Sequence, residues 1–256
     1  MKLLIDAGNT RIKWAVVKQK QWLCSGVLPA EQADALALQI ADHLGKLRIG
    51  LHDIQQIWVS NVAGEKIAQH IRNIDADKSA SLHFVVARDR QCGVRNGYSN
   101  PSQLGSDRWA ALIAAWHLVQ QKCLVVNSGT ATTIDALSGQ GEFMGGIIAP
   151  GVELMQRSVV TATVQLKAAQ GKYVAFPQNS ADALYSGAIQ AGCGAIERQY
   201  ALLEDDNAPL ILSGGAAELL QRCLDQKRFR APLRVVDNLV LQGLLLMAQE
   251  NVTESL

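Results

Sequence analysis

Residues 3–17 read LLIDAGNTRIKWAVV, two apolar runs joined by a short polar turn. Apolar runs of this length around Gly and Asn predict two β-strands in a hairpin. The stretch also brings together a carboxylate, a glycine N–H, a hydroxyl and an ammonium, from Asp6, Gly8, Thr10 and Lys13. A plain hairpin does not need these groups, whereas a Mg²⁺-bound nucleotide phosphate is held by groups of these kinds.

The same pattern returns in residues 124–136, which read LVVNSGTATTIDA. A strand, an Asx-x-Gly turn, a hydroxyl and a second strand follow in the same order, and the offset from Asp6 to Asn127 is 121 residues. In a chain of 256 residues this offset is close to half the length. Two halves that begin alike indicate a duplicated domain with a site between the copies.

The rest of the chain alternates helices and strands. In the first half we expect strands at 22–28, 54–59 and 82–86 and helices at 30–44, 66–74 and 109–121. In the second half we expect a hairpin at 124–148, a helix at 180–203, a strand at 210–212, a helix to 224, a strand at 233–236 and a final helix. This order predicts an α/β protein with two domains, 1–116 and 117–256, whose boundary falls inside the helix at 109–121.

Composition excludes several classes of protein. Apolar residues make up 48% of the chain and charged residues 18%, which is ordinary for a globular domain with a sizeable core. A net charge of +1 gives no bulk attraction for nucleic acid. The five cysteines are an odd number without a C-x-x-C pair, which argues against a disulfide framework or a zinc ribbon and fits a reducing cytoplasm. Asp6 interrupts any signal-peptide core, and the late apolar stretch at 239–248 is too short for a membrane span, so we expect a soluble cytoplasmic protein.

The common phosphate-binding and catalytic signatures are absent from the sequence. It contains no P-loop, no Rossmann glycine motif, no zinc-protease motif and no nucleophile elbow. Phosphate must then be held by glycine-containing turns at strand ends, of which the candidates are 6–10, 127–133 and 213–215. Each turn alone is a weak signal, because Asx-Gly turns are common in ordinary hairpins.

A polar loop at 91–104 leads into Gly105, Ser106, Asp107 and Arg108, just before a strong helix. The simplest interpretation makes Asp107 a helix cap. Arg108, however, has the wrong charge for the first turn of a helix, and Tyr98 adds a ring with a polar tip to the loop. These features favour a small-molecule site in which Asp107 accepts a hydroxyl proton and Arg108 neutralises phosphoryl or carboxylate charge.

Four motifs together resemble the type III pantothenate kinases. They are Asp-x-Gly-Asn-Thr at 6–10, Gly-x-Asp-Arg at 105–108, Gly-Thr-Ala-x-Thr-x-Asp at 129–135 and Gly-Gly-x-Ile-x-Pro-Gly at 145–151. They occur in the family's order over almost the whole chain. That family belongs to the superfamily of actin, sugar kinases and Hsp70 ATPases. The resemblance therefore implies two duplicated actin-like (ribonuclease H-like) domains, each a mixed sheet with flanking helices, and an ATP cleft between them.

The resemblance also implies the reaction and its residues. Family members are phosphotransferases that use ATP and Mg²⁺ to convert pantothenate to 4′-phosphopantothenate, the first step of coenzyme A biosynthesis, and act as homodimers. The positions that match the ATP-binding residues are Asp6, Ala7, Gly8, Asn9, Thr10, Arg11, Ile12, Lys13 and Thr130. Those that match the pantothenate-binding residues are Tyr98, Gly105, Ser106, Asp107, Arg108 and, from the partner subunit, Ser180. Asp107 matches the catalytic proton acceptor.

One position departs from the pattern of the resembled family. A K⁺ or NH₄⁺ ion is expected beside an Asp that opens the second hairpin motif, and this chain has Asn127 there. Asn keeps a carbonyl oxygen but lacks the negative charge that holds a cation. Two alternatives therefore stay open: a regulatory protein on the same scaffold, like the family's Bvg accessory factors, with weak or no kinase activity, and another kinase of the superfamily that acts on a sugar or an acid.

Overall fold

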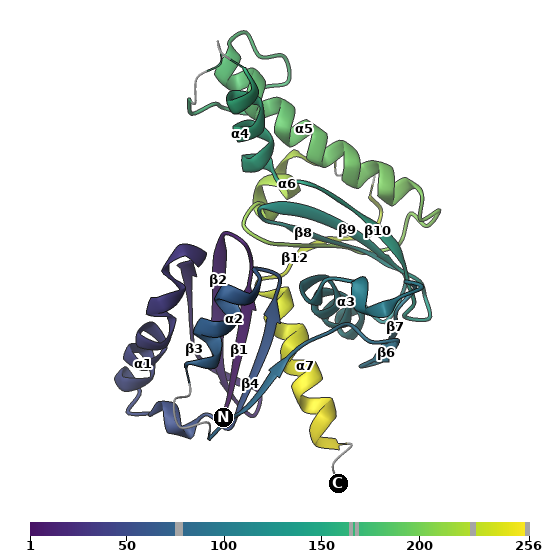
Figure 1. The fold of residues 1–256 in the computed structure, drawn as a ribbon. Helices are drawn as coiled ribbons and strands as arrows, with labels where there is room; N and C mark the ends of the chain where they lie inside the picture. The colour runs from purple at the N-terminus through teal and green to yellow at the C-terminus, as the bar shows by residue number, and fades with distance from the viewer. Residues whose placement is uncertain (75–78, 164–165, 167–168, 226–228, 254–256) are drawn as a thin grey trace. The chain divides into compact units, whose positions relative to one another are not determined.

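The structure is a computed structural model that describes residues 1–256 except 75–78, 164–165, 167–168, 226–228 and 254–256 (Figure 1). It contains two compact units. The first unit is Met1–Ala114 with Val240–Leu256, and the second is Ala115–Leu239. The end of the chain thus belongs with the first unit, whereas the division expected at residue 116 groups it with the second half. Among the described residues, no helix is long and apolar enough to cross a membrane.

The first unit contains a five-stranded mixed sheet in the order β3-β2-β1-β4-β5. Its strands are β1 (Lys2–Ala7), β2 (Arg11–Lys18), β3 (Gln21–Pro29), β4 (Gln56–Asn61) and β5 (Ser81–Phe84). The β1–β2–β3 segments are antiparallel, and β4 and β5 continue the sheet in parallel. The predicted opening hairpin and the three further predicted strands of the first half are confirmed.

Helices cover this sheet because its central strands are apolar on both faces. Leu3 and Ile5 of β1 belong to the core that α1 (Leu36–Lys46) and α2 (Glu65–Arg72) complete. The helix predicted at 30–44 is wrong in its first part: residues Ala30–Ala35 form a short 3₁₀ segment, which follows Pro29 without a side-chain cap. A second short 3₁₀ turn, Leu51–Asp53, leads into β4.

The last helix, α7 (Leu239–Thr253), packs within the first unit. A Cβ atom at Gly243 would lie only 1.9 Å from the carbonyl oxygen of Ala110 in α3 (Ser106–Val119), so the two helix backbones are in close contact there. The Lys2 ammonium donates a hydrogen bond to the carbonyl oxygen of Ala248 at 2.5 Å. Strand β1 and helix α7, at opposite ends of the sequence, are therefore joined.

The second unit repeats the strand order of the first, as β10-β9-β8-β11-β12. Its strands are β8 (Cys123–Ser128), β9 (Ala131–Leu137), β10 (Phe143–Pro150), β11 (Leu210–Ser213) and β12 (Leu233–Val235). Again the first three strands are antiparallel and the last two are parallel to β8. The duplication predicted from two sequence motifs is confirmed at the level of whole sheets.

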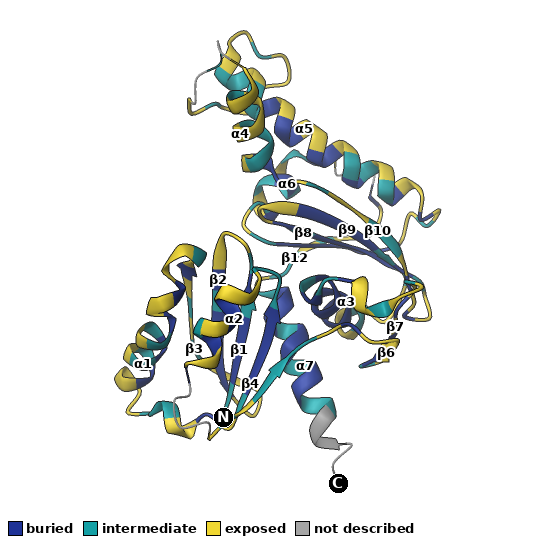
Figure 2. Ribbon diagram, viewed as in Figure 1, coloured by how far each residue is buried: buried dark blue, intermediate teal, exposed yellow. Residues whose placement is uncertain are grey.

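Helices α4 (Val152–Ala162), α5 (Ser180–Ala201) and α6 (Ala217–Cys223) lie in the second unit. Residues of α5 and α6 share a buried core with β8 and β11, as the dark ribbon in Figure 2 indicates. Helix α4 begins directly after Gly151. It was not predicted from the sequence, because most of its residues are exposed or half-buried and its apolar residues do not form a clear helical repeat.

Candidate active site

The carboxylate of Asp6 lies at the end of β1, between two polar residues of neighbouring strands. In the sheet register, Asp6 pairs with Lys13 on β2 and with Ser60 on β4. Directly paired residues project from the same face of a sheet, so an ammonium and a hydroxyl flank this carboxylate. The turn beyond it is closed by a hydrogen bond from the Gly8 N–H to the carbonyl oxygen of Arg11 at 3.0 Å.

The environment of Asp6 favours a cation. The pKa of the Asp6 carboxyl is raised to about 7, mainly by loss of hydration and to a smaller extent by the nearby Asp107 carboxylate, while Lys13 acts in the opposite direction. Two carboxylates that repel each other in this way are suited to a Mg²⁺ ion, which binds one or two carboxylates and completes its shell with water and phosphate oxygens. Among the described residues, no group of three or more His, Cys, Asp or Glu side chains could hold a metal by itself.

The segment 105–108 forms the start of α3. This helix begins at Ser106, three residues earlier than predicted, so Asp107 lies inside its first turn and not in front of it. Oδ1 of Asp107 accepts a hydrogen bond from the Arg108 N–H at 2.8 Å. A Cβ atom at Gly105 would come within 2.6 Å of that oxygen, so a glycine leaves room for the carboxylate. The carboxylate orientation is therefore fixed by its own helix.

Arg108 and Tyr98, which the sequence predicts in one site, are in contact. Arg108 is only 5% exposed, and its Nη1 donates to the Tyr98 hydroxyl oxygen at 3.1 Å. The guanidinium carbon lies 5.9 Å from the centre of the Tyr98 ring, within the range of a cation–π interaction. A guanidinium held in place beside Asp107 can neutralise an anionic substrate group without first being ordered.

The loop at 91–104 is ordered by specific bonds, and it contains a small hairpin, β6 (Arg90–Gln91) with β7 (Val94–Arg95), and a 3₁₀ turn, Pro101–Gln103. Oε1 of Gln91 accepts from the indole N–H of Trp109 at 3.1 Å. Asn96 accepts from the backbone N–H of Tyr98 at 3.0 Å. The loop therefore presents Tyr98 from a fixed frame.

A carboxylate of the last helix also binds this loop. Glu250 accepts from the backbone N–H of Cys92 at 2.8 Å and from its Sγ at 3.3 Å. Glu250, Gln91 and Ser60 were not identified from the sequence, because each acts through a partner that lies far away in the chain.

In the second unit, Asn127 occupies the position that corresponds to Asp6. It pairs with Thr133 on β9 and with Ser213 on β11. Its turn is closed by a hydrogen bond from the Gly129 N–H to the carbonyl oxygen of Ala131 at 2.9 Å. Every side chain in this set is neutral, in contrast to the Asp6 and Lys13 pair.

Two further glycine segments pack against this second turn. Gly214 has a φ of +95°, and a Cβ atom there would come within 2.3 Å of the Ser128 carbonyl oxygen and 2.8 Å of Asn127 Oδ1. Gly151 donates its N–H to the Thr130 carbonyl oxygen at 2.9 Å. The turns at 127–133 and 213–215, predicted as separate phosphate candidates, are therefore in contact with each other.

Ser180 is the exposed first residue of α5. Asn179 caps the helix by accepting from the Asp182 N–H at 2.9 Å, as expected from the sequence. The Ser180 side chain is thus left at the surface of the second unit.

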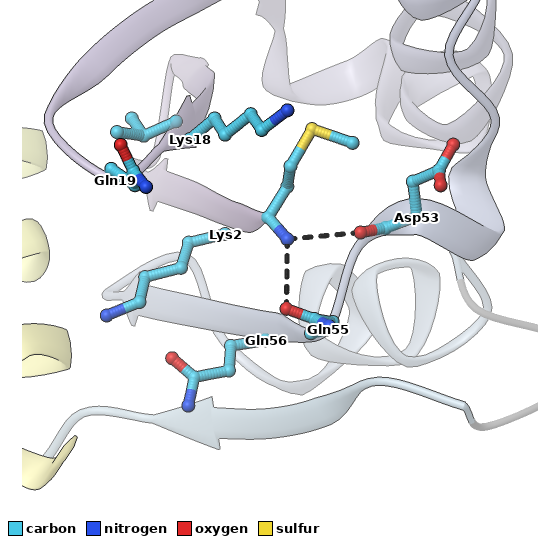
Figure 3. Close-up of a pocket in the computed structure, with 8 residues that line it drawn as sticks. Lys2, Lys18, Gln19, Asp53, Gln55 and Gln56 are labelled. Atoms are coloured by element: carbon cyan, nitrogen blue, oxygen red, sulfur yellow. Dashed lines mark hydrogen bonds between the residues drawn. The ribbon is translucent and has the colours of Figure 1, made fainter.

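A cavity of about 630 Å³ lies at the opposite end of β1 from Asp6 (Figure 3). It is lined by Met1, Lys2, Val17, Lys18, Gln19, Asp53, Gln55 and Gln56. The N-terminal ammonium donates to the Asp53 carbonyl oxygen and to Gln55 Oε1, at 3.1 and 3.2 Å. No residue of the predicted site lines this cavity, so we do not assign it to the active site.

Two mixed sheets of identical strand order, each opening with a polar Asx-x-Gly turn, define a protein of the actin-like and sugar-kinase fold class. A candidate 2-dehydro-3-deoxygalactonokinase from Sinorhizobium meliloti has this fold, with a TM-score of 0.63, 15% identity and coverage of 98% of this chain and 96% of that one. A candidate Baf family transcriptional activator from Campylobacter jejuni aligns with a TM-score of 0.57 and 23% identity, over 98% of this chain and 99% of that one.

The sequence comparison is more specific. The sequence model of type III pantothenate kinase matches residues 2–202. A type III pantothenate kinase from Nitrosospira multiformis is 46% identical over 251 residues, which cover 97% of this chain and 91% of that protein. The chain belongs to the type III pantothenate kinase family.

Proposed function

We propose that this protein transfers the γ-phosphoryl group of ATP to pantothenate and forms 4′-phosphopantothenate, the first step of coenzyme A biosynthesis. The observation that carries the proposal is the cluster at the start of α3, where Asp107 lies near Asp6 and Arg108 contacts Tyr98. A carboxylate, a cation-binding carboxylate and a buried guanidinium are the groups that phosphoryl transfer to an alcohol requires. Membership of the type III pantothenate kinase family supports pantothenate as the acceptor.

In the proposed reaction, Asp107 accepts the proton of the pantothenate hydroxyl as the phosphorus–oxygen bond forms. Arg108 and the turn N–H groups stabilise charge on the transferring phosphoryl group. The Asp6 carboxylate would hold Mg²⁺, which neutralises the phosphate charge of ATP when bound. The remaining proposed ATP contacts come from the turn residues up to Lys13 and from Thr130. Most of the rate enhancement then comes from position and charge, so a modest base suffices.

A coupled ADP-release assay tests this function. We expect turnover with pantothenate and none with sugars or other hydroxy acids at the same concentration. Turnover with a sugar instead would contradict pantothenate as the substrate and support another kinase of the superfamily. Binding of ATP or pantothenate without turnover would contradict the kinase proposal and support a regulatory protein like the Bvg accessory factors.

We further propose that the monovalent cation position lies at Asn127 and binds K⁺ or NH₄⁺ weakly. The Asn127 side chain lies next to Gly214 and offers an amide oxygen, while its paired residues Thr133 and Ser213 add no negative charge. A neutral oxygen set holds a monovalent cation less firmly than a carboxylate does. The ADP-release assay with and without K⁺ or NH₄⁺ is expected to show weak activation.

We also propose a homodimer formed through the second unit. Phe176 is 89% exposed. Tyr173 and Val174, which precede it in the sequence, and Val159 on α4 are also exposed. The segment before α5 is fixed to that helix, because the Val174 N–H donates to Ser186 Oγ at 2.9 Å. Several exposed apolar side chains in one segment favour a protein contact.

A dimer through this surface would involve the start of α5, where Ser180 is exposed, and would let Ser180 reach the partner's pantothenate. Light scattering after size-exclusion chromatography is expected to give twice the chain mass for the wild type and the single-chain mass for Phe176→Asp. A wild-type monomer at micromolar concentration would contradict the dimer.

A further inference from the structure

Ser60 and Ser106 join the end of β4 to the first residue of α3. Their hydroxyl oxygens lie 2.9 Å apart, in a hydrogen bond between side chains 46 residues apart in sequence. Ser60 is fully buried, and Ser106 is 8% exposed. A side chain without exposed surface cannot contact a substrate, so Ser60 can act on the reaction only through its neighbours.

Those neighbours are the two carboxylates of the proposed site. Ser60 is the register partner of Asp6, so both side chains project from the same face of the sheet. Ser106 immediately precedes Asp107, whose carboxylate is already fixed within the helix by the Arg108 N–H. The hydrogen bond within α3 fixes the Asp107 carboxylate relative to its own helix. The distance from Asp107 to Asp6 then depends on the position of α3 relative to β1 and β4. The bond between the two serines joins these parts.

We infer that Ser60 is a positioning residue, whose hydrogen bond to Ser106 sets the distance between Asp107 and Asp6. This inference rests on the proposed phosphorylation of pantothenate. A displacement of about 1 Å at a reacting group can lower a rate about 100-fold, so one buried hydrogen bond at this place has a large effect on turnover. Tyr98 and Arg108, which are proposed to hold pantothenate, are bonded to each other and keep that contact when the bond between Ser60 and Ser106 is lost.

The test is Ser60→Ala, which removes the hydroxyl with little change in volume. We expect kcat to fall about tenfold, which is less than the loss of about 100-fold that a displacement of about 1 Å can cause. KM for pantothenate is expected to change less than twofold. A role in folding alone would lower the melting temperature without this selective loss of kcat. Ser60→Thr keeps the hydroxyl and is expected to keep most of kcat.

Tyr200→Phe is the matched control. It removes a buried hydroxyl that bonds to the carbonyl oxygens of Asp206 and Ala208, both at 2.9 Å, in the core of the second unit. It is expected to lower the melting temperature and to leave kcat and KM unchanged. A folded Ser60→Ala protein with wild-type kcat, or with a loss that appears only in KM for pantothenate, would overturn the inference.

Ser106→Ala removes the same bond from the helix side, where alanine is well tolerated. The Ser60→Ala/Ser106→Ala double variant is expected to lose no more activity than Ser106→Ala alone. Independent, multiplying losses would overturn the inference, as would a wild-type kcat in Ser106→Ala if Ser60→Ala does not fold. Absence of wild-type turnover with pantothenate would instead contradict the proposed function, so the two failures are distinguishable.

Discussion

The turn after β1 and the turn after β8 are two versions of one structure, and they differ in charge and in length. In each, an Asx side chain is paired with one residue on the antiparallel strand and with a serine on the parallel strand. Ser60 and Ser213 are the same residue type at equivalent places. The antiparallel partners differ, because Lys13 in the first unit corresponds to Thr133 in the second.

The two turns also differ in length. Ala7 and Ile12 are the last paired residues around the first turn, and four residues lie between them. Ser128 and Thr132 are the last pair around the second turn, and three residues lie between them. The second turn is one residue shorter. We infer that the first turn is built to handle charge and the second to approach a ligand with neutral groups and backbone.

The largest expected effect is that of the base beside the charged turn. Asp107→Asn keeps the side-chain shape but removes proton acceptance, and we expect kcat to fall about 10²- to 10⁴-fold with KM for pantothenate nearly unchanged. Steady-state ADP release measures both quantities. Asp42→Asn, which changes an exposed aspartate paired with Lys46 on α1, is the control and should retain wild-type turnover. Near-normal kcat in Asp107→Asn would remove Asp107 from the role of proton acceptor.

A smaller effect is expected when the first turn is given the neutral pair of the second. Lys13→Thr places at the first turn the residue type that the second turn has at Thr133. We expect kcat/KM for MgATP to fall about 10-fold, the equivalent of roughly 1.4 kcal/mol for a lost charge contact to phosphate. Lys13 also lowers the pKa of Asp6, so its removal should move the acidic limb of the same profile to higher pH.

Lys18→Thr is the control for that experiment, because Lys18 is an exposed lysine at the far end of the same strand. Its pH profile and kcat/KM should equal those of the wild type. If Lys13→Thr and Lys18→Thr behave alike, the charge contrast between the two turns has no functional meaning.

Most of the fold could be predicted from the sequence, because β-strand periodicity and Asx-Gly turns are local signals. The equivalence of Asp6 and Asn127 followed directly from the motif. The equivalence of Lys13 and Thr133 could not be predicted in this way. A constant offset of 121 residues pairs Lys13 with Ile134, and only the sheet register shows that the second turn is one residue shorter. Ser60 was likewise not identified, because a lone serine after a strand has no pattern of its own.

Stability should also distinguish the turns. The folded-state pKa of Asp6, about 7, lies above its ordinary value of 3.8. Between these values the folded protein binds more protons than the unfolded chain, so Asp6 lowers stability progressively as the pH rises from about 4 to about 7. Asp6→Asn is therefore expected to raise the melting temperature at pH 8 and to leave it nearly unchanged at pH 4. Differential scanning calorimetry at both pH values measures this, and a lower melting temperature at pH 8 would contradict it.

The smallest effect is expected from restoring a charge to the second turn. Asn127→Asp is nearly isosteric and places a carboxylate where Thr133 and Ser213 offer only hydroxyls. A full negative charge attracts K⁺ more strongly than an amide oxygen does, so we expect activation by K⁺ to increase a few-fold, equivalent to about 1 kcal/mol at this partly solvated position. Asn207→Asp, which adds the same charge in an exposed loop of the same unit, is the control for charge alone. ADP release titrated with K⁺ at constant ionic strength gives the measurement. If Asn127→Asp and Asn207→Asp respond alike to K⁺, the cation does not bind at the second turn, and the neutrality of that turn serves nucleotide contact alone.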